Sequence, residues 1–209
     1  MDNDSLLMKA LSEPNRYLRR DKLSALIVAV RKGEYKLSLD EAKALYQAQL
    51  EEAKRPGEFD GATYQSLWHL LKYSPPWETL KKVTGHLLAN PRTICRGFAL
   101  YYLLNNYPEM AEELLKKHQD DPDPEVQDEI ARFLVKKDKR RAIEHWEKAL
   151  GSDRLPHELA ETIPQAIAYF SEKEDLQRYE EWDRRLGGRT IWGVIASLIK
   201  ERLETKGQG

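Results

Sequence analysis

Apolar residues recur at spacings of three and four along most of this chain, which is the period of an amphipathic helix. Four of them stand at i, i+4, i+7 and i+8: Val126, Ile130, Phe133 and Leu134. The stripes at 64–71, 77–88 and 142–150 repeat this period. Because side chains three and four positions apart share one face of a helix, each segment is predicted to be a helix that buries one face.

Proline divides the central part of the chain at regular intervals. The prolines at positions 75, 91, 108 and 124 are 16, 17 and 16 residues apart, so that two intervals make a 33-residue unit. Proline is favoured at the first position of a helix, and Ser74, Asn90 and Asp123 are good N-caps for the helices that would begin there. The short turns that remain predict neighbouring helices packed antiparallel.

Local signals extend the helical pattern to both ends of the chain. Ser38 and Glu41 have the spacing of a capping box before a helix at 39–53, and Gly187-Gly188 predicts a turn before a terminal helix that begins near Thr190. The segment 91–106 has almost no polar face and is expected to be the most buried helix.

Together these elements predict an all-α fold of about a dozen helices, an α-α superhelix, or solenoid, of stacked antiparallel pairs. One domain is expected over residues 1–209, less regular at 1–74 and built of regular repeats at 75–206.

Composition supports a folded helical chain and limits its setting. The 209 residues include 33% charged residues, and the mean hydropathy is -0.71, which suits the large surface of an elongated helical stack. Cys95 is the only cysteine, so no intrachain disulfide can form and a reducing cytoplasm is expected. The start of the chain lacks the basic residues of a secretory signal, and the longest strongly apolar stretch, 23–30, is too short to span a bilayer, so no membrane association is expected.

Part of the chain resembles known helical repeats. From about Glu125 to Leu150 it resembles a tetratricopeptide repeat, with Ala142 and Ala149 as the small residues that would let two helices approach closely around Trp146. The stretch 120–135 opens with Asp-Pro-Asp-Pro-Glu-Val and is also similar to the start of a HEAT-repeat helix. Both resemblances imply a stack of helix pairs used as a protein-binding scaffold.

Catalytic and metal-binding patterns are incomplete in this sequence. His157 and Glu158 begin like the zinc-protease pattern, but Glu161 stands where the second histidine is needed. Cys95 is expected either to pack in the core as a small side chain or to act as a nucleophile. A reactive thiol needs accessible, electropositive surroundings, whereas packing in the core requires only that the helix be apolar. Arg92 and Arg96, one turn apart, would form either an anion-binding pair or the solvated edge of their helix. No enzyme activity, cofactor or metal is expected, and most of the histidines are expected at the surface or at its boundary with the core.

Charge is unevenly distributed although the net charge is -1. Six acidic residues fall within ten positions that contain no Lys or Arg: Asp120, Asp121, Asp123, Glu125, Asp128 and Glu129. The next turn between helices collects cations: Lys136, Lys137, Lys139, Arg140 and Arg141. The acids suit the positive N-terminus of the intervening helix, and the first two lysines suit its negative C-terminus. The alternative is that these charges form an interface with a partner.

These features predict a non-catalytic protein-binding α-solenoid, for which an immunity protein that neutralises a toxin in a bacterium is one concrete form. The alternative is a nucleic-acid-binding protein or a DNA-glycosylase-like protein of the HEAT type, with four candidate contacts: Arg92, Arg96, Tyr101 and Tyr102. A nucleic-acid-binding domain is expected to be basic, whereas this chain has a pI near 6.6, so the protein partner is favoured. A third class, an enzyme with an all-helical pocket, would require a deep cleft that gathers titratable groups.

Overall fold

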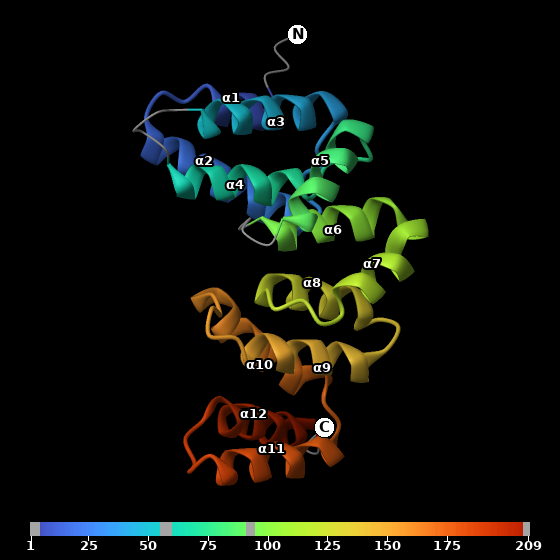
Figure 1. Cartoon of the computed structure of the whole chain (residues 1–209). Coiled ribbons are helices and arrows are strands. Elements are labelled where there is room, and N and C mark those ends of the chain that lie inside the picture. Colours follow the sequence, from blue (N-terminus) through green and yellow to red (C-terminus); the bar gives the residue numbers. More distant parts are fainter. Residues whose placement is uncertain (1–4, 55–59, 91–94, 207–209) are drawn as a thin grey trace. The chain divides into compact units, whose positions relative to one another are not determined.

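The computed structural model describes residues 5–54, 60–90 and 95–206, and over these ranges the chain is all α-helical (Figure 1). The described residues form twelve α-helices and one short 3-10 helix, and they contain no strand. The all-α prediction is therefore confirmed. The stacking of the whole chain as a solenoid stays a prediction.

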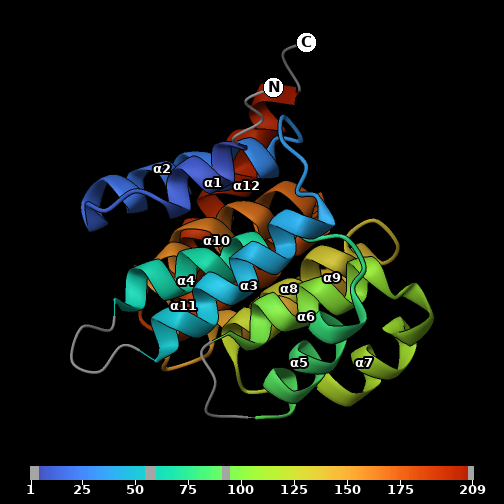
Figure 2. The same ribbon diagram turned by 90° about the horizontal axis from the view of Figure 1, so that it is seen from above.

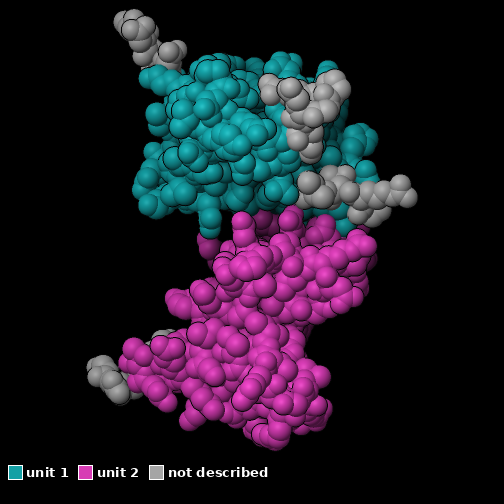
Figure 3. Space-filling model, turned by 90° about the vertical axis from the view of Figure 1, so that its left-hand side faces the viewer, with its two compact units in different colours: residues 1–112 teal, residues 113–209 magenta. Residues whose placement is uncertain are grey.

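The helices group into two compact units, residues 1–112 and residues 113–209 (Figure 3). The first unit contains α1 (Leu6–Leu11), α2 (Arg16–Arg31), α3 (Leu39–Ala53), α4 (Gly61–Leu71), α5 (Glu78–Ala89), α6 (Arg96–Asn106) and the 3-10 helix η1 (Pro108–Met110). The division between the units falls within α7 (Ala111–His118). The second unit contains α8 (Pro124–Leu134), α9 (Lys139–Leu150), α10 (His157–Phe170), α11 (Lys173–Arg185) and α12 (Ile191–Lys206).

Within each unit, helices pack against partners that are one or two places away in chain order. In the first unit α1 contacts α2 and α3, α4 contacts α2, α3 and α6, and α5 contacts α6 (Figure 2). In the second unit α8 packs on α9, α10 contacts α8, α9 and α12, and α11 packs on α12. Each amphipathic helix therefore covers its apolar face with near neighbours in the sequence, as the periodic pattern requires.

Several predicted boundaries are confirmed because local chemistry sets them. The Ser38 hydroxyl accepts the Glu41 amide at 3.2 Å while the Glu41 carboxylate accepts the Ser38 amide at 2.8 Å, so that α3 begins at Leu39. Asp123 caps α8 through the Glu125 amide at 3.0 Å. These caps use only residues within one helical turn, which explains why the sequence predicts them.

The predicted helix start at Ser74-Pro75 is wrong. Pro76 follows Pro75 directly, and a residue before proline is restricted to extended conformations, so a helix cannot begin there. Helix α5 begins at Glu78 instead. The buried Tyr102 hydroxyl accepts the Trp77 amide at 2.8 Å and its single hydrogen is shared between the carbonyls of Pro75 and Trp77, both at 3.3 Å, which holds this extended segment against α6.

Two other proline sites differ from the prediction. Asn90 is the C-cap of α5, and the helix start predicted directly after it, at Pro91, lies outside the described residues. Pro108 opens the 3-10 helix η1, after which α7 begins at Ala111. The apolar segment predicted at 91–106 is described from Cys95 onward, and Cys95, Ala99 and Leu100 are fully buried in it. None of the described helices is long and apolar enough to cross a lipid bilayer.

Candidate interaction site

The α8–α9 helix pair carries most of the candidate residues that the sequence singles out. Ala142, Trp146 and Ala149 are at most 1% exposed, as expected for two helices that approach closely around a large side chain. Trp146 also stacks on the Phe170 ring of α10, with ring centroids 5.8 Å apart. This buried face fixes the orientation of the charged residues on the rest of the pair.

Asp121 lies in the turn before α8 and is used inside the unit. Its Oδ2 accepts the His118 Nδ1 hydrogen at 2.9 Å, and its Oδ1 accepts the Asp123 amide at 3.1 Å. The side chains of His118 and Asp121 are 6% and 5% exposed. Asp121 therefore positions the α7–α8 turn, and its carboxylate is withdrawn from solvent.

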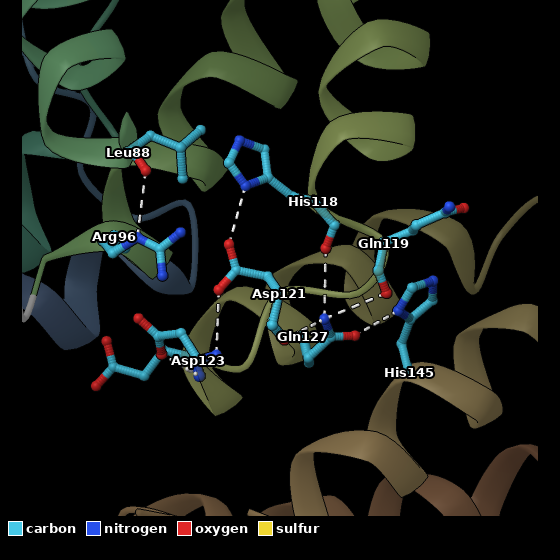
Figure 4. A network of polar contacts seen from close by, with 9 residues as sticks. Leu88, Arg96, His118, Gln119, Asp121, Asp123, Gln127 and His145 are labelled. Atoms are coloured by element: carbon cyan, nitrogen blue, oxygen red, sulfur yellow. Dashed lines mark hydrogen bonds and ion pairs between the residues drawn. The ribbon is translucent and has the colours of Figure 1, made fainter. Parts of the chain in front are cut away.

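Gln127 and His145 form a buried polar link between the α7–α8 turn and α9 (Figure 4). Gln127 Nε2 donates to the backbone carbonyls of His118, Gln119 and Asp121, at 3.4, 3.4 and 2.7 Å. Because these carbonyls fix the amide orientation, Gln127 Oε1 is the acceptor and His145 Nδ1 the donor of the 2.6 Å bond between them.

His145 is held in its neutral form. Burial lowers the pKa of its imidazole to about 4, and the positive charges of Lys148 and Arg141 act in the same direction. Near neutral pH the ring therefore carries one proton, on Nδ1, where the Gln127 oxygen accepts it. His118 and His145 are both 5% exposed, so these two lie in the interior and not at the surface or its boundary, where most histidines are expected.

Asp128 lies at the interface of α8 with α9. Its Oδ1 accepts the indole N–H of Trp146 at 2.8 Å, and its Oδ2 accepts Arg132 Nε at 2.7 Å. Its side chain is 7% exposed, and the neighbouring Glu129 is also buried. Neither carboxylate contributes to the surface of the predicted acidic edge.

The solvent-facing part of that edge is small. Asp120 is exposed and binds Lys148 Nζ at 2.7 Å, and this hydrogen bond, together with the charge of the lysine, lowers the pKa of the Asp120 carboxyl. Lys148 also donates to the Gln119 carbonyl at 2.9 Å. Asp123 and Glu125 are partly exposed. Of the six acids, the structure therefore leaves three at the surface, which are Asp120, Asp123 and Glu125.

The opposite end of the helix pair presents five exposed cations, which we call the basic turn: Lys136, Lys137, Lys139, Arg140 and Arg141. Arg140 is 92% exposed and its Nε lies 3.6 Å from Glu144. Lys137 Nζ lies 4.7 Å above the Phe133 ring. Among the described residues, no carboxylate lies within ion-pair distance of the other basic-turn cations, so the positive charge is left to solvent.

The position of these cations differs from the prediction in one respect. Lys139, Arg140 and Arg141 do not lie in the turn but form the first turn of α9, after its N-cap Asp138. The N-terminus of a helix carries a partial positive charge, so cations there cost about 0.3–1 kcal/mol each where exposed. Helix electrostatics therefore account for Lys136 and Lys137, which follow α8, but not for the three cations that open α9.

The remaining candidates belong to the first unit and are largely internal. Arg96 is 6% exposed and its Nε donates to the Leu88 carbonyl at 3.2 Å (Figure 4), so it is not the solvated edge of its helix. Tyr102 is fully buried. Tyr101 is half-buried, with Lys72 Nζ 4.7 Å above its ring. Arg92 lies outside the described residues.

The described residues do not bring metal-ligating or nucleophilic side chains together at one site. No three His, Cys, Asp or Glu side chains within the described ranges come together as a set of metal ligands. Cys95 is a free, fully buried thiol. His157 is exposed and faces Glu161 at 3.6 Å on the surface of α10.

Sequence reasoning missed Gln127 and His145, because both are polar residues on faces that the tertiary structure buries. A usable signal existed for His145, which lies next to Trp146 on the stripe at 142–150.

No protein-family model matches this chain, and neither a curated protein nor a solved structure matches it.

Proposed function

We propose that this chain is a non-catalytic helical protein that binds an acidic surface of a partner protein through the basic turn. The observation that carries the proposal is the placement of Lys139, Arg140 and Arg141 in the first turn of α9, where they oppose the helix dipole. Residues that reduce local stability and leave their charge exposed are accounted for by a binding role.

The underlying helix pair gives the basic turn a fixed geometry. The Trp146–Asp128 and His145–Gln127 hydrogen bonds join α8 to α9 in the buried interface. Side chains on rigid elements lose less conformational freedom on binding, which favours affinity. Opposite charges on the two surfaces would also raise the association rate, in a manner that depends on salt.

Neutralisation of a bacterial toxin is one form that this function would take. It requires a partner with an acidic patch large enough to cover the basic turn. A nucleic-acid ligand is the competing candidate because five clustered cations also suit phosphates. The buried Arg96 and Tyr102 give no support to the glycosylase-like form of that alternative.

The proposal is tested by capture from native lysate, identification of the captured protein by mass spectrometry, and titration of the purified partner. The triple variant Lys139→Glu, Arg140→Glu, Arg141→Glu is expected to weaken binding at least tenfold. A matched control, Lys36→Glu, Lys82→Glu, Lys173→Glu, makes the same change in net charge at exposed lysines elsewhere and is expected to bind as the wild type does.

Two outcomes would overturn the proposal. Equal binding by the triple variant and the control would remove the basic turn from the interface. Loss of capture after nuclease treatment, with retention of an oligonucleotide that depends on the basic turn, would make the ligand a nucleic acid.

A further inference from the structure

The longest strongly apolar stretch of the chain, residues 23–30, forms the second half of α2. One face of this stretch belongs to the core of the first unit, where Leu23, Leu26 and Val30 are at most 9% exposed. In that unit α2 packs against α1 and α4 (Figure 2). Val28 points away from the core and is 47% exposed. Packing within the first unit therefore accounts for only one of the two apolar faces of α2.

The exposed apolar face extends along most of the helix. Tyr17 and Val28 are eleven residues apart, and an interval of eleven returns a side chain to nearly the same line along an α-helix. Leu18 and Ala25 are seven residues apart and share a neighbouring line. Tyr17 and Leu18 are 60% and 50% exposed. The small residues Ser24 and Ala25 lie before Val28, and small side chains let a second helix approach closely.

Cations border this exposed face on both sides. Arg20 and Arg31, also eleven residues apart, follow one edge, and Lys22 lies at the other. Lys22 pairs with Glu13 at 2.6 Å, whereas Arg20 and Arg31 form no ion pair with any described residue. The only carboxylate of α2 is Asp21, against five cations: Arg16, Arg19, Arg20, Lys22 and Arg31. Even with Glu13 included, positive charge is in excess along this helix, which complements an acidic ligand.

We infer that the exposed face of α2 binds an amphipathic helix of a partner protein, whose apolar side chains contact Tyr17, Leu18 and Val28. Carboxylates at the edge of that helix bind Arg20 and Arg31. Two helices recognise each other in this way, through apolar residues along the middle of the contact and opposite charges along its edges. Intervals of seven and eleven residues repeat along a helix axis, so a second helix matches them over several turns.

Other occupants fit this face less well. A second copy of α2 would bring cations together, because Arg20 and Arg31 border the two halves of the face and meet their equivalents in either orientation. Asp21 lies on the exposed face between Tyr17 and Ser24. Anionic headgroups would repel its carboxylate, and burial among acyl chains is costly. A partner helix can present a single cation to Asp21 while its carboxylates bind the two arginines.

The test is fluorescence anisotropy of the full-length chain with a pool of fluorescein-labelled 21-residue peptides. Each peptide has three heptads with Leu at a and d and Glu at e and g, except that the central a position is Leu, Lys or Arg. At least one member is expected to bind saturably. Its affinity is expected to fall at least tenfold with Val28→Gln, with the double variant Arg20→Glu, Arg31→Glu, and on replacement of every glutamate of the peptide by lysine. The three changed side chains are exposed, and circular dichroism of each variant confirms that the fold is retained.

Each variant has a matched control. Val194→Gln changes a valine that is 50% exposed on α12, in the second unit. The double variant Arg140→Glu, Arg141→Glu reverses two exposed cations of the basic turn. Both controls are expected to bind the peptide as the wild type does. Binding that falls in the basic-turn control and not in Val28→Gln would place the peptide on the basic turn and overturn the inference.

Three further results would overturn it. The first is the failure of every peptide to bind at about 1 mM protein, the lower limit of useful affinity. The second is equal binding by the α2 variants and the wild type. The third is Val28-dependent formation of a homodimer, or Val28-dependent binding of phosphatidylserine vesicles, in place of peptide binding. Failure of the basic-turn proposal leaves these expectations unchanged, because the two surfaces share no residue.

Discussion

The Asp128 carboxylate accepts the indole N–H of Trp146 at 2.8 Å, across the interface of α8 with α9. Both residues are almost fully buried, at 5% and 1% exposure. A charged residue that the sequence places on an acidic surface is thus a hydrogen-bond acceptor inside the protein. Its second oxygen accepts Arg132 Nε, so that each oxygen of the buried carboxylate has a hydrogen-bond donor.

Removal of this carboxylate is expected to destabilise the second unit. Asp128→Ala would leave the buried indole N–H without an acceptor, at a cost of about 1–3 kcal/mol in the free energy of unfolding. Urea denaturation followed by tryptophan fluorescence measures the loss. Asp120→Ala is the control, because Asp120 is exposed and pairs with Lys148 at the surface, and the stability of this variant is expected to match the wild type. Equal stabilities of the two variants would contradict a structural role for Asp128.

Acid is expected to weaken the second unit through His145. The unfolded histidine has a pKa near 6.5, whereas burial holds the folded pKa at about 4. As the pH falls from about 7 to 5, the unfolded chain therefore gains a proton that the folded chain does not, and stability falls by about 1–2 kcal/mol.

The variant His145→Gln is expected to reduce this pH dependence, whatever its stability at pH 7. His157→Gln, at an exposed position, is expected to retain it. Urea denaturation at a series of pH values gives the comparison. The dependence that remains is expected to include His69 of the first unit, whose pKa burial also lowers to about 4. An unchanged slope in His145→Gln would contradict the assignment.

Loss of the Tyr102 hydroxyl is expected to release the segment before α5. Tyr102→Phe removes the acceptor of the part-buried hydrogen bond from the Trp77 amide and should cost about 1–3 kcal/mol. Hydrogen exchange at the Trp77 amide is expected to accelerate. The control is Tyr17→Phe, where the hydroxyl is exposed and accepts only the neighbouring Arg16. Unchanged exchange at Trp77 would show that the hydroxyl does not hold the segment.

Charge reversal at the start of α9 is expected to stabilise the protein while it weakens partner binding. Lys139→Glu replaces a cation by an anion near the positive end of the helix, which should raise the free energy of unfolding by about 0.3–1 kcal/mol. Lys148→Glu, in the last turn of the same helix, should have the opposite effect and also loses the contacts with Asp120 and Gln119. Thermal denaturation compares the two. A less stable Lys139→Glu variant would mean that Lys139 is there for stability rather than for binding.

The candidate site could be predicted from sequence only in outline. The run of acids at 120–129 and the run of bases at 136–141 were visible as charge patterns. The two runs differ in solvent exposure in the folded protein, because the side chains of Asp121, Asp128 and Glu129 are buried around α8 whereas the basic side chains remain exposed. The contact between the Trp182 and Trp192 rings had no sequence signal, because it forms only where α11 packs on α12.

The sequence by itself determined the helical elements, because period and capping act within one or two turns of chain. The capping box of α3, the Asp123-Pro124 start of α8 and the Gly187-Gly188 turn are of this kind. Tertiary structure decided which polar groups are buried and what holds the extended segment before α5. Those outcomes depend on partners that packing supplies from 18 or 25 residues away, as Trp146 does for Asp128 and Tyr102 for Trp77, and no local pattern specifies which residue arrives.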